Sequence, residues 1–160
     1  MPRRAARSSF VDLLAGGVCG PLGIRDVSLA ATAAGARRPG EVATYDHPGI
    51  ALSQLQPSTL MMAPNAYGGD HVLENGEGAG GLLTSASSVA RLIGSHAVWN
   101  VGPRELGTRY GTLEGSCAGA VSRPDGLDVA FLFNRRVTDA EHDQIAAALN
   151  AVIDHSGHAW

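Results

Sequence analysis

Residues 104–133 read RELGTRYGTLEGSCAGAVSRPDGLDVAFLF, and this stretch decides the fold. It divides into three strand-like runs, which we place at 104–112, 116–122 and 127–133. The turn signal between the last two runs is strong, because Pro124 presets φ and Asp125-Gly126 accepts left-handed backbone geometry. Short connections join antiparallel neighbours. The stretch therefore predicts an antiparallel sheet of about three strands.

The last of these strands is apolar on both sides. Successive side chains point to opposite faces, with Val129, Phe131 and Phe133 on one face and Ala130 and Leu132 on the other. A strand with two apolar faces is typical of a covered position inside a sheet. We therefore expect residues 127–133 to form a central strand.

Helices are predicted on both sides of this stretch in the sequence. Thr138 and Glu141 form a capping box, and a helical apolar stripe follows it at Ile145, Leu149, Val152 and Ile153. Upstream, Thr84 or Ser85 can cap a second helix, whose stripe is Val89, Leu92 and Ile93. A short strand is expected at Ala97–Val101. Strands and helices in separate runs predict an α+β fold.

The first half of the chain has a different character. One helix is expected from Ser9 to Val18, with Ser8 or Ser9 as its cap. Prolines and glycines then interrupt residues 20–80 so often that no helical or strand period is sustained. We expect a single domain over residues 1–160, with an irregular and helical segment at 1–80 and the helix, sheet and C-terminal helix at 81–160.

Composition excludes several classes of function. The chain has 160 residues and a net charge of −3, which argues against a nucleic-acid partner or a polybasic membrane contact. No apolar run is long enough to predict a transmembrane span. The two cysteines, Cys19 and Cys117, form no disulfide framework, so a reducing cytoplasmic location is expected. All 12 basic residues are arginine, which excludes chemistry that needs a lysine amine.

Local motifs do not predict a catalytic, metal or cofactor site. Gly115-Ser-Cys117-Ala-Gly119 matches a nucleophile elbow with cysteine in place of serine, but a strand and not a helix follows it. A buried thiol is the favoured interpretation. Asp70-His71 and Glu141-His142 are interpreted as surface or capping residues, not as acid–base pairs. The glycine-rich run at 76–81 lacks the strand and the acidic residue of a dinucleotide site.

Five segments, in order, resemble the C-terminal half of β-lactamase-related serine hydrolases, the family of class C β-lactamases, D-alanyl-D-alanine carboxypeptidases and related esterases. They are Gly20-Pro-Leu-Gly-Ile24-Arg-Asp26, Pro39-Gly-Glu-Val-Ala-Thr-Tyr45-Asp46, Gly80-Gly-Leu-Leu-Thr-Ser-Ala86-Ser-Ser-Val-Ala-Arg91, Arg109-Tyr-Gly111-Thr-Leu-Glu-Gly115 and Asp125-Gly-Leu-Asp-Val-Ala-Phe-Leu-Phe-Asn134-Arg135. The resemblance implies an incomplete β-lactamase/penicillin-binding-like fold, in which a C-terminal helix backs the antiparallel sheet and the irregular segment belongs to a helical second lobe. Full members hydrolyse an amide or ester through an acyl-serine.

Departures from the family pattern limit what this chain is expected to do. The family's Ser-x-x-Lys pair would precede Gly20, and the chain has no lysine, so no catalytic residue is assigned. The third motif, which lines the family's cleft, falls on Arg109, Tyr110, Gly111 and Thr112, and an arginine there can bind an anion but cannot shuttle protons. We expect no hydrolysis by these residues alone. The alternatives are a non-catalytic binding or regulatory module and a truncated gene product.

The resemblance also bears on partners. In the family, the strand at 127–134 pairs with an N-terminal strand that this sequence lacks. We therefore expect an exposed apolar edge there, or an edge covered by residues 1–20, by a second copy or by a partner chain. A small-molecule or peptide ligand is compatible with the cleft motif; no cofactor is expected.

Overall fold

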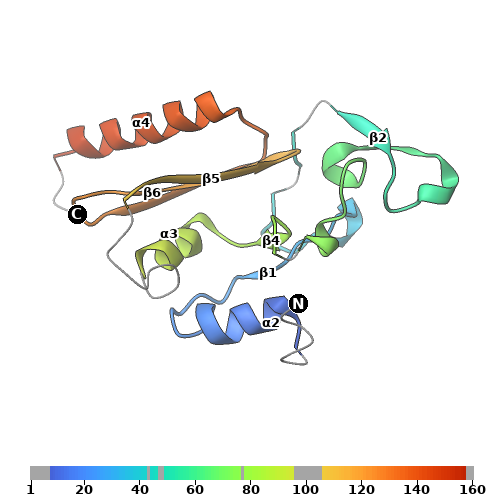
Figure 1. Cartoon of the computed structure of the whole chain (residues 1–160), viewed down its shortest axis with the longest axis horizontal. Helices are drawn as coiled ribbons and strands as arrows, with labels where there is room; N and C mark the ends of the chain where they lie inside the picture. The colour runs from blue at the N-terminus through green and yellow to red at the C-terminus, as the bar shows by residue number, and fades with distance from the viewer. Residues whose placement is uncertain (1–7, 43, 47–48, 77, 96–105, 158–160) are drawn as a thin grey trace.

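The computed structural model describes residues 8–42, 44–46, 49–76, 78–95 and 106–157. It is an α+β fold around one antiparallel sheet of three strands, β5 (Gly107–Leu113), β6 (Ser116–Ser122) and β7 (Asp128–Phe133), in the order β5-β6-β7. Helix α4 (Asp139–His155) covers one face of this sheet, and helix α3 (Ala86–Gly94) lies on the opposite face (Figure 1). The predicted sheet and its backing helix are confirmed. The strand expected at 97–101 falls outside the described residues.

The sheet forms from two tight hairpins. Residues of β5 and β6 pair from Gly107 with Ser122 to Leu113 with Ser116, so the turn is only two residues long and Leu113, predicted in the turn, is in the strand. The second hairpin is held to α4 by Arg123, whose guanidinium donates to Asp125 and to Asp154 at 2.6 Å each. The predicted Pro124-Asp125-Gly126 turn forms this hairpin, and the ion pair between Arg123 and Asp154 fixes it to α4.

The position of β7 corrects one expectation. Among the strands that the structure describes, β7 pairs with β6 alone, so it is an edge strand and not a central one. Its C-terminal end is touched by the preceding half of the chain, where the Asp46 amide donates to the Asn134 carbonyl at 2.7 Å. Leu132 and Phe133 are exposed. The apolar character on both faces of the strand reflects coverage by α3 and α4, not a second neighbouring strand.

The core between the sheet and α4 is small. Cys117, Phe131 and Val137 are buried together, and Ile145 and Leu149 of α4 pack against them. The helix begins at the predicted capping box: the Glu141 amide donates to the Thr138 hydroxyl, and the Glu141 carboxylate accepts from the Thr138 amide at 2.7 Å. A fixed helix start sets which residues of α4 face the sheet.

The first half of the chain folds into short elements. Helix α2 (Phe10–Leu14), capped by Ser9, continues as a π-helical turn over Ala15–Cys19, which ends one residue beyond the predicted helix. Four short strands, which the sequence pattern missed, make two small antiparallel pairs: β1 (Ser28–Leu29) with β4 (Leu82–Leu83), and β2 (Ile50–Leu52) with β3 (Met62–Pro64). Single 3₁₀ turns lie at Ala34–Ala36, Pro57–Thr59, Asn65–Tyr67 and Leu73–Asn75.

Polar contacts hold this irregular segment together. Buried Thr32 donates through its amide and its hydroxyl to the two carboxylate oxygens of Glu74, at 3.0 and 2.5 Å. The Arg37 guanidinium lies over the Tyr45 and Tyr67 rings, 4.5 and 4.7 Å from their centroids. Such contacts add to the few ladder hydrogen bonds that the short strands of this segment provide. Within the described residues, no helix combines the length and the apolar character needed to cross a bilayer.

Candidate functional site

The four residues of the cleft motif occupy edge strand β5, and the alternation of the strand divides them between two faces. Tyr110 points to the α4 side, where its ring stacks on the His142 ring with centroids 4.1 Å apart and planes at 16°. Thr112 shares that side, and its hydroxyl donates to the Ser116 carbonyl at 3.1 Å. Arg109 and Gly111 point to the α3 side. Only Arg109 of the four therefore offers a charged group on the α3 side of the sheet.

A cysteine and a histidine meet beneath Tyr110. The Cys117 sulfur lies 3.6 Å from Nε2 and 3.8 Å from Nδ1 of His142, and both side chains are buried. The Phe131 ring lies on the same histidine, with centroids 6.0 Å apart. Burial raises the pKa of the Cys117 thiol, and the nearby Glu141 carboxylate adds to this effect. A nucleophilic cysteine needs a lowered pKa and access to substrate, so this pair is a packing contact.

His142 corrects another expectation, because it was interpreted as a surface or capping residue and is instead fully buried. Glu141, beside it, does cap the helix, and Asp70 and His71 form a surface contact at 3.2 Å. The signal for His142 was in the sequence. It stands three residues before Ile145 and seven before Leu149, so it extends the apolar stripe of α4 by one turn.

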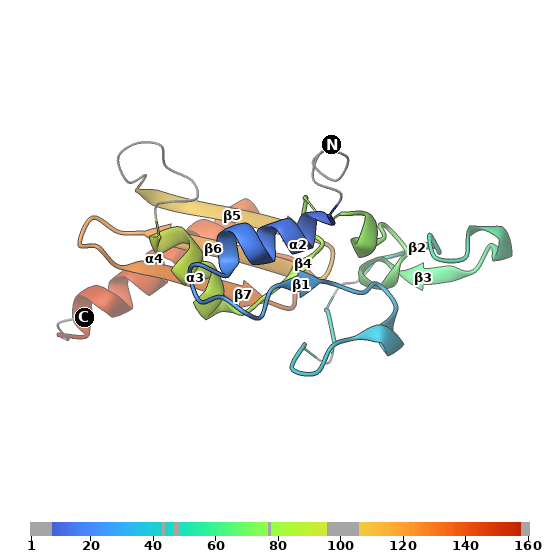
Figure 2. The same cartoon turned by 90° about the horizontal axis from the view of Figure 1, so that it is seen from below.

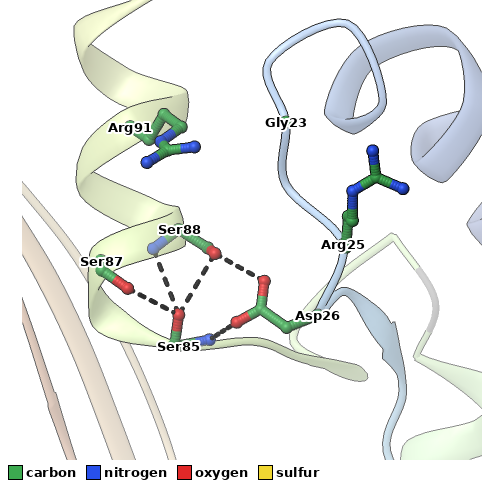
Figure 3. A pocket seen from close by; sticks show the side chains of 7 residues that line it. All are labelled: Gly23, Arg25, Asp26, Ser85, Ser87, Ser88 and Arg91. Carbon is green, nitrogen blue, oxygen red and sulfur yellow. Dashed lines mark hydrogen bonds between the residues drawn. The ribbon is translucent and has the colours of Figure 1, made fainter.

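A polar pocket of about 400 Å³ lies between α3 and the chain segment that enters β1 (Figure 3). Asp26 connects the two walls. Its carboxylate accepts from the Ser85 amide at 2.9 Å and from the Ser88 hydroxyl at 2.5 Å. These hydrogen bonds from Ser85 and Ser88 lower the pKa of Asp26 to about 2. Asp26 therefore stays ionised and holds the first turn of α3 against the segment before β1.

Two arginines line the same pocket. Arg25 precedes Asp26, and Arg91 reaches from α3 to the Leu22 carbonyl at 3.4 Å. Figure 3 shows the Arg91 guanidinium beside α3, whereas the Arg25 guanidinium points away from α3. No described carboxylate forms an ion pair with either of them. Arg91 can therefore donate to the oxygen atoms of an anion in this pocket.

The pocket joins two segments that are far apart in sequence but that both carry the resemblance described above. Asp26 ends the segment at 20–26, and Ser85, Ser88 and Arg91 lie in the segment at 80–91. Nothing in local spacing predicted Asp26 as a site residue, because its partners Ser85 and Ser88 lie about sixty residues away. In the part of the chain that the structure describes, no three His, Cys, Asp or Glu side chains gather as a metal site would require.

A scan of the chain against protein-family models finds no match. The resemblance to β-lactamase-related hydrolases therefore stays a prediction.

The edge of the sheet formed by β7 is the remaining candidate. Beyond β6, β7 has no neighbouring strand among the residues that the structure describes, and the exposed Leu132 and Phe133 lie at its C-terminal end. In an edge strand, alternate backbone amides and carbonyls point away from the sheet and can accept a further strand. The chemistry available there is backbone hydrogen bonding combined with apolar contact.

Proposed function

We propose that this chain is a β-lactamase-related scaffold that acts as a binding module and holds an extended segment of a partner along the edge of β7. The observation that carries the proposal is that β7, apolar on both faces, has β6 as its only strand neighbour among the described residues. Adding a strand gives affinity through main-chain hydrogen bonds and specificity through alternate side chains.

Hydrolysis by this chain alone is disfavoured on chemical grounds. The sequence has no lysine to activate a serine. The Cys117–His142 pair lies in the core, out of reach of a substrate. Arginine, the residue at position 109 of the cleft motif, binds anions but is a poor proton shuttle. Binding is the function that these residues can still perform.

Intact-mass labelling tests the absence of catalysis. The purified chain is incubated with a fluorophosphonate and, separately, with a penicillin, next to a complete serine hydrolase of the family as positive control. We expect no adduct under conditions that label the control fully. A stoichiometric adduct on one residue, such as Ser116, would show that a lysine-free acyl enzyme exists and would overturn the proposal.

A strand-addition assay tests the binding itself. The probe is a fluorescein-labelled peptide that copies residues 127–134, and the readout is its anisotropy as the chain is titrated. We expect saturable binding that Leu132→Lys abolishes, because a charged lysine on an edge strand opposes pairing. The matched control is Val152→Lys on α4, which should bind as the parent chain does. Equal binding by both variants would contradict edge pairing.

The arginine pocket supports a second candidate function, the binding of a small anion. Its specific observation is that neither Arg25 nor Arg91 pairs with a described carboxylate. The test is calorimetric titration with inorganic phosphate and with succinate. We expect binding by the parent chain and no binding by Arg91→Gln. The control variant Arg135→Gln, whose substitution is distant in the fold, should bind as the parent chain does. No heat of binding from either anion would dismiss this candidate.

A further inference from the structure

The β2–β3 ribbon carries an apolar surface that neither function above uses. From Gly49 to Gly69 the chain contains no acidic, basic or histidine residue, although the surrounding positions include Asp46, His47 and Asp70. In both cartoon views the ribbon extends from one end of the molecule, away from the three-stranded sheet and its helices (Figure 1, Figure 2). An uncharged projection of this length is unusual for a surface exposed to water.

The large apolar side chains lie on the outer face of the ribbon. Ile50 pairs with Pro64, Ala51 with Ala63, and Leu52 with Met62. Cross-strand partners share a face and alternate residues change face, so Ile50, Leu52, Met62 and Pro64 lie together. Their exposed fractions are 65% for Ile50, 49% for Leu52 and 55% for Met62. The inner face carries only the two alanines, which are partly buried. We call Ile50, Leu52, Met62 and Pro64 the ribbon patch.

The loop that joins β2 to β3 also exposes large apolar side chains. Leu60 is 74% exposed and Met61 is exposed beside it. Leu60 also holds a left-handed backbone, with φ of 52°, which disfavours any residue with a side chain other than asparagine or aspartate. A leucine that is 74% exposed at a left-handed position buries little of its apolar surface within a single copy of the chain. This observation points to a contact outside the described chain.

We propose that the ribbon patch is the interface of a twofold homodimer. The patch is nearly symmetric about the Ala51–Ala63 pair, with Ile50 and Pro64 on one side and Leu52 and Met62 on the other. A twofold axis that lies between the two copies, opposite that pair, therefore sets apolar residues of one copy against apolar residues of the other. Because the ribbon has no charged residue, two copies meet without like-charge repulsion. Closed twofold pairing is the commonest form of self-association.

Other occupants fit the patch less well. A ribbon that anchors to an anionic lipid surface is expected to carry lysine or arginine beside its apolar residues, and residues 49–69 have neither. Two-stranded ribbons are at best marginally stable in water until a further layer packs on them. A second copy supplies that layer with the same residues and needs no further component.

Sedimentation velocity of the full chain across a wide concentration range tests the dimer. We expect a monomer–dimer equilibrium in the parent chain and a loss of association by at least ~30-fold in Leu52→Glu, because a charge at the centre of an apolar interface is strongly unfavourable. Met62→Lys should act in the same way. The control is Val152→Glu, an equally apolar and 69% exposed position on α4, which should leave the dimer intact. Circular dichroism checks that each variant is folded.

Each other outcome identifies a different occupant or a different interface. A parent chain that stays monomeric at every concentration would overturn the inference. Flotation of the chain with vesicles of neutral phosphatidylcholine, abolished by Leu52→Glu, would replace the second copy with a lipid surface. If Phe133→Glu dissociates the dimer and Leu52→Glu does not, copies pair through β7. That last result would refute the ribbon interface and leave the proposed edge pairing standing.

Discussion

The Phe131 ring lies directly across the backbone of Gly119, its partner in the β6–β7 ladder. A Cβ built on Gly119 would overlap the ring atoms of Phe131. The same ring contacts Phe133, with centroids 5.6 Å apart, and His142 at 6.0 Å. Because Gly119 has no side chain, the Phe131 ring can pack across its backbone.

Gly119→Ala should destabilise the chain by ~1–3 kcal/mol, because the added methyl group displaces the Phe131 ring from a packed core. Chemical denaturation followed by circular dichroism measures the change. Gly111→Ala on β5 is the control, since a Cβ there meets nothing within 4 Å, and it should be close to neutral. Equal effects from the two alanines would contradict the placement of the ring.

The thiol of Cys117 should resist alkylation in the native chain. Burial raises its pKa, so the reactive thiolate is scarce near neutral pH, and the sulfur is enclosed by the core residues around it. Iodoacetamide labelling followed by peptide mass mapping should modify Cys117 only after unfolding. Rapid modification of the native chain would place the Cys117–His142 pair in reach of solvent and would reopen a nucleophilic role.

Asp26 should stabilise the fold in a pH-dependent way. Its pKa is lowered from 3.8 to about 2 by hydrogen bonds from Ser85 and Ser88. A carboxylate with a lowered pKa contributes stability above its unfolded pKa, and this contribution is lost as the pH falls towards 2. Asp26→Asn should therefore lower the free energy of unfolding by less than ~1 kcal/mol at neutral pH, since the group is exposed, and by nothing near pH 2.

The control for Asp26 is Ser87→Ala. Ser87 contacts the Ser85 hydroxyl and not the Asp26 carboxylate, so the pH dependence of stability should not change. Thermal unfolding at several pH values compares the variants. A difference between Asp26→Asn and the parent chain that persists unchanged at pH 2 would contradict the ionised contact.

Leu60→Gly should raise the stability of the monomeric chain by ~1 kcal/mol, because glycine adopts the left-handed backbone of Leu60 without steric cost. Thermal unfolding at low concentration measures this gain. The same variant should weaken self-association, since it removes an exposed apolar side chain from the tip of the ribbon. A loss of monomer stability would mean that the leucine side chain contributes contacts within its own chain.

The sequence was most informative where local chemistry determines structure. The capping box at Thr138 and the Pro-Asp-Gly turn at 124–126 located α4 and the second hairpin, because both signals act within a few residues. The apolar alternation of β7 was read correctly as a strand but not as an edge strand. Coverage by helices on both faces gives the same pattern as a central position in a sheet.

Most features that the sequence did not predict depend on contacts between residues that are far apart in the chain. The contact of Asp26 with Ser85 and Ser88 has no signature in spacing, because about sixty residues separate the partners. Strands β2 and β3 are only three residues each and contain alanine and proline, so no period of two could emerge. The helical spacing of the apolar residues in α4 places His142 on the buried face. Histidine is less often fully buried than the aliphatic residues, and this preference favoured the wrong interpretation.

Hydrogen exchange of the β7 amides tests the central claim most directly. In a dilute sample of the full chain, we expect the amides of 129–133 that point away from β6 to exchange much faster than the amides of 117–121 in β6, which has a strand on both sides. Addition of the 127–134 peptide should then slow those amides. If every amide of 129–133 is already protected in the free monomer, the edge is closed and the binding account fails.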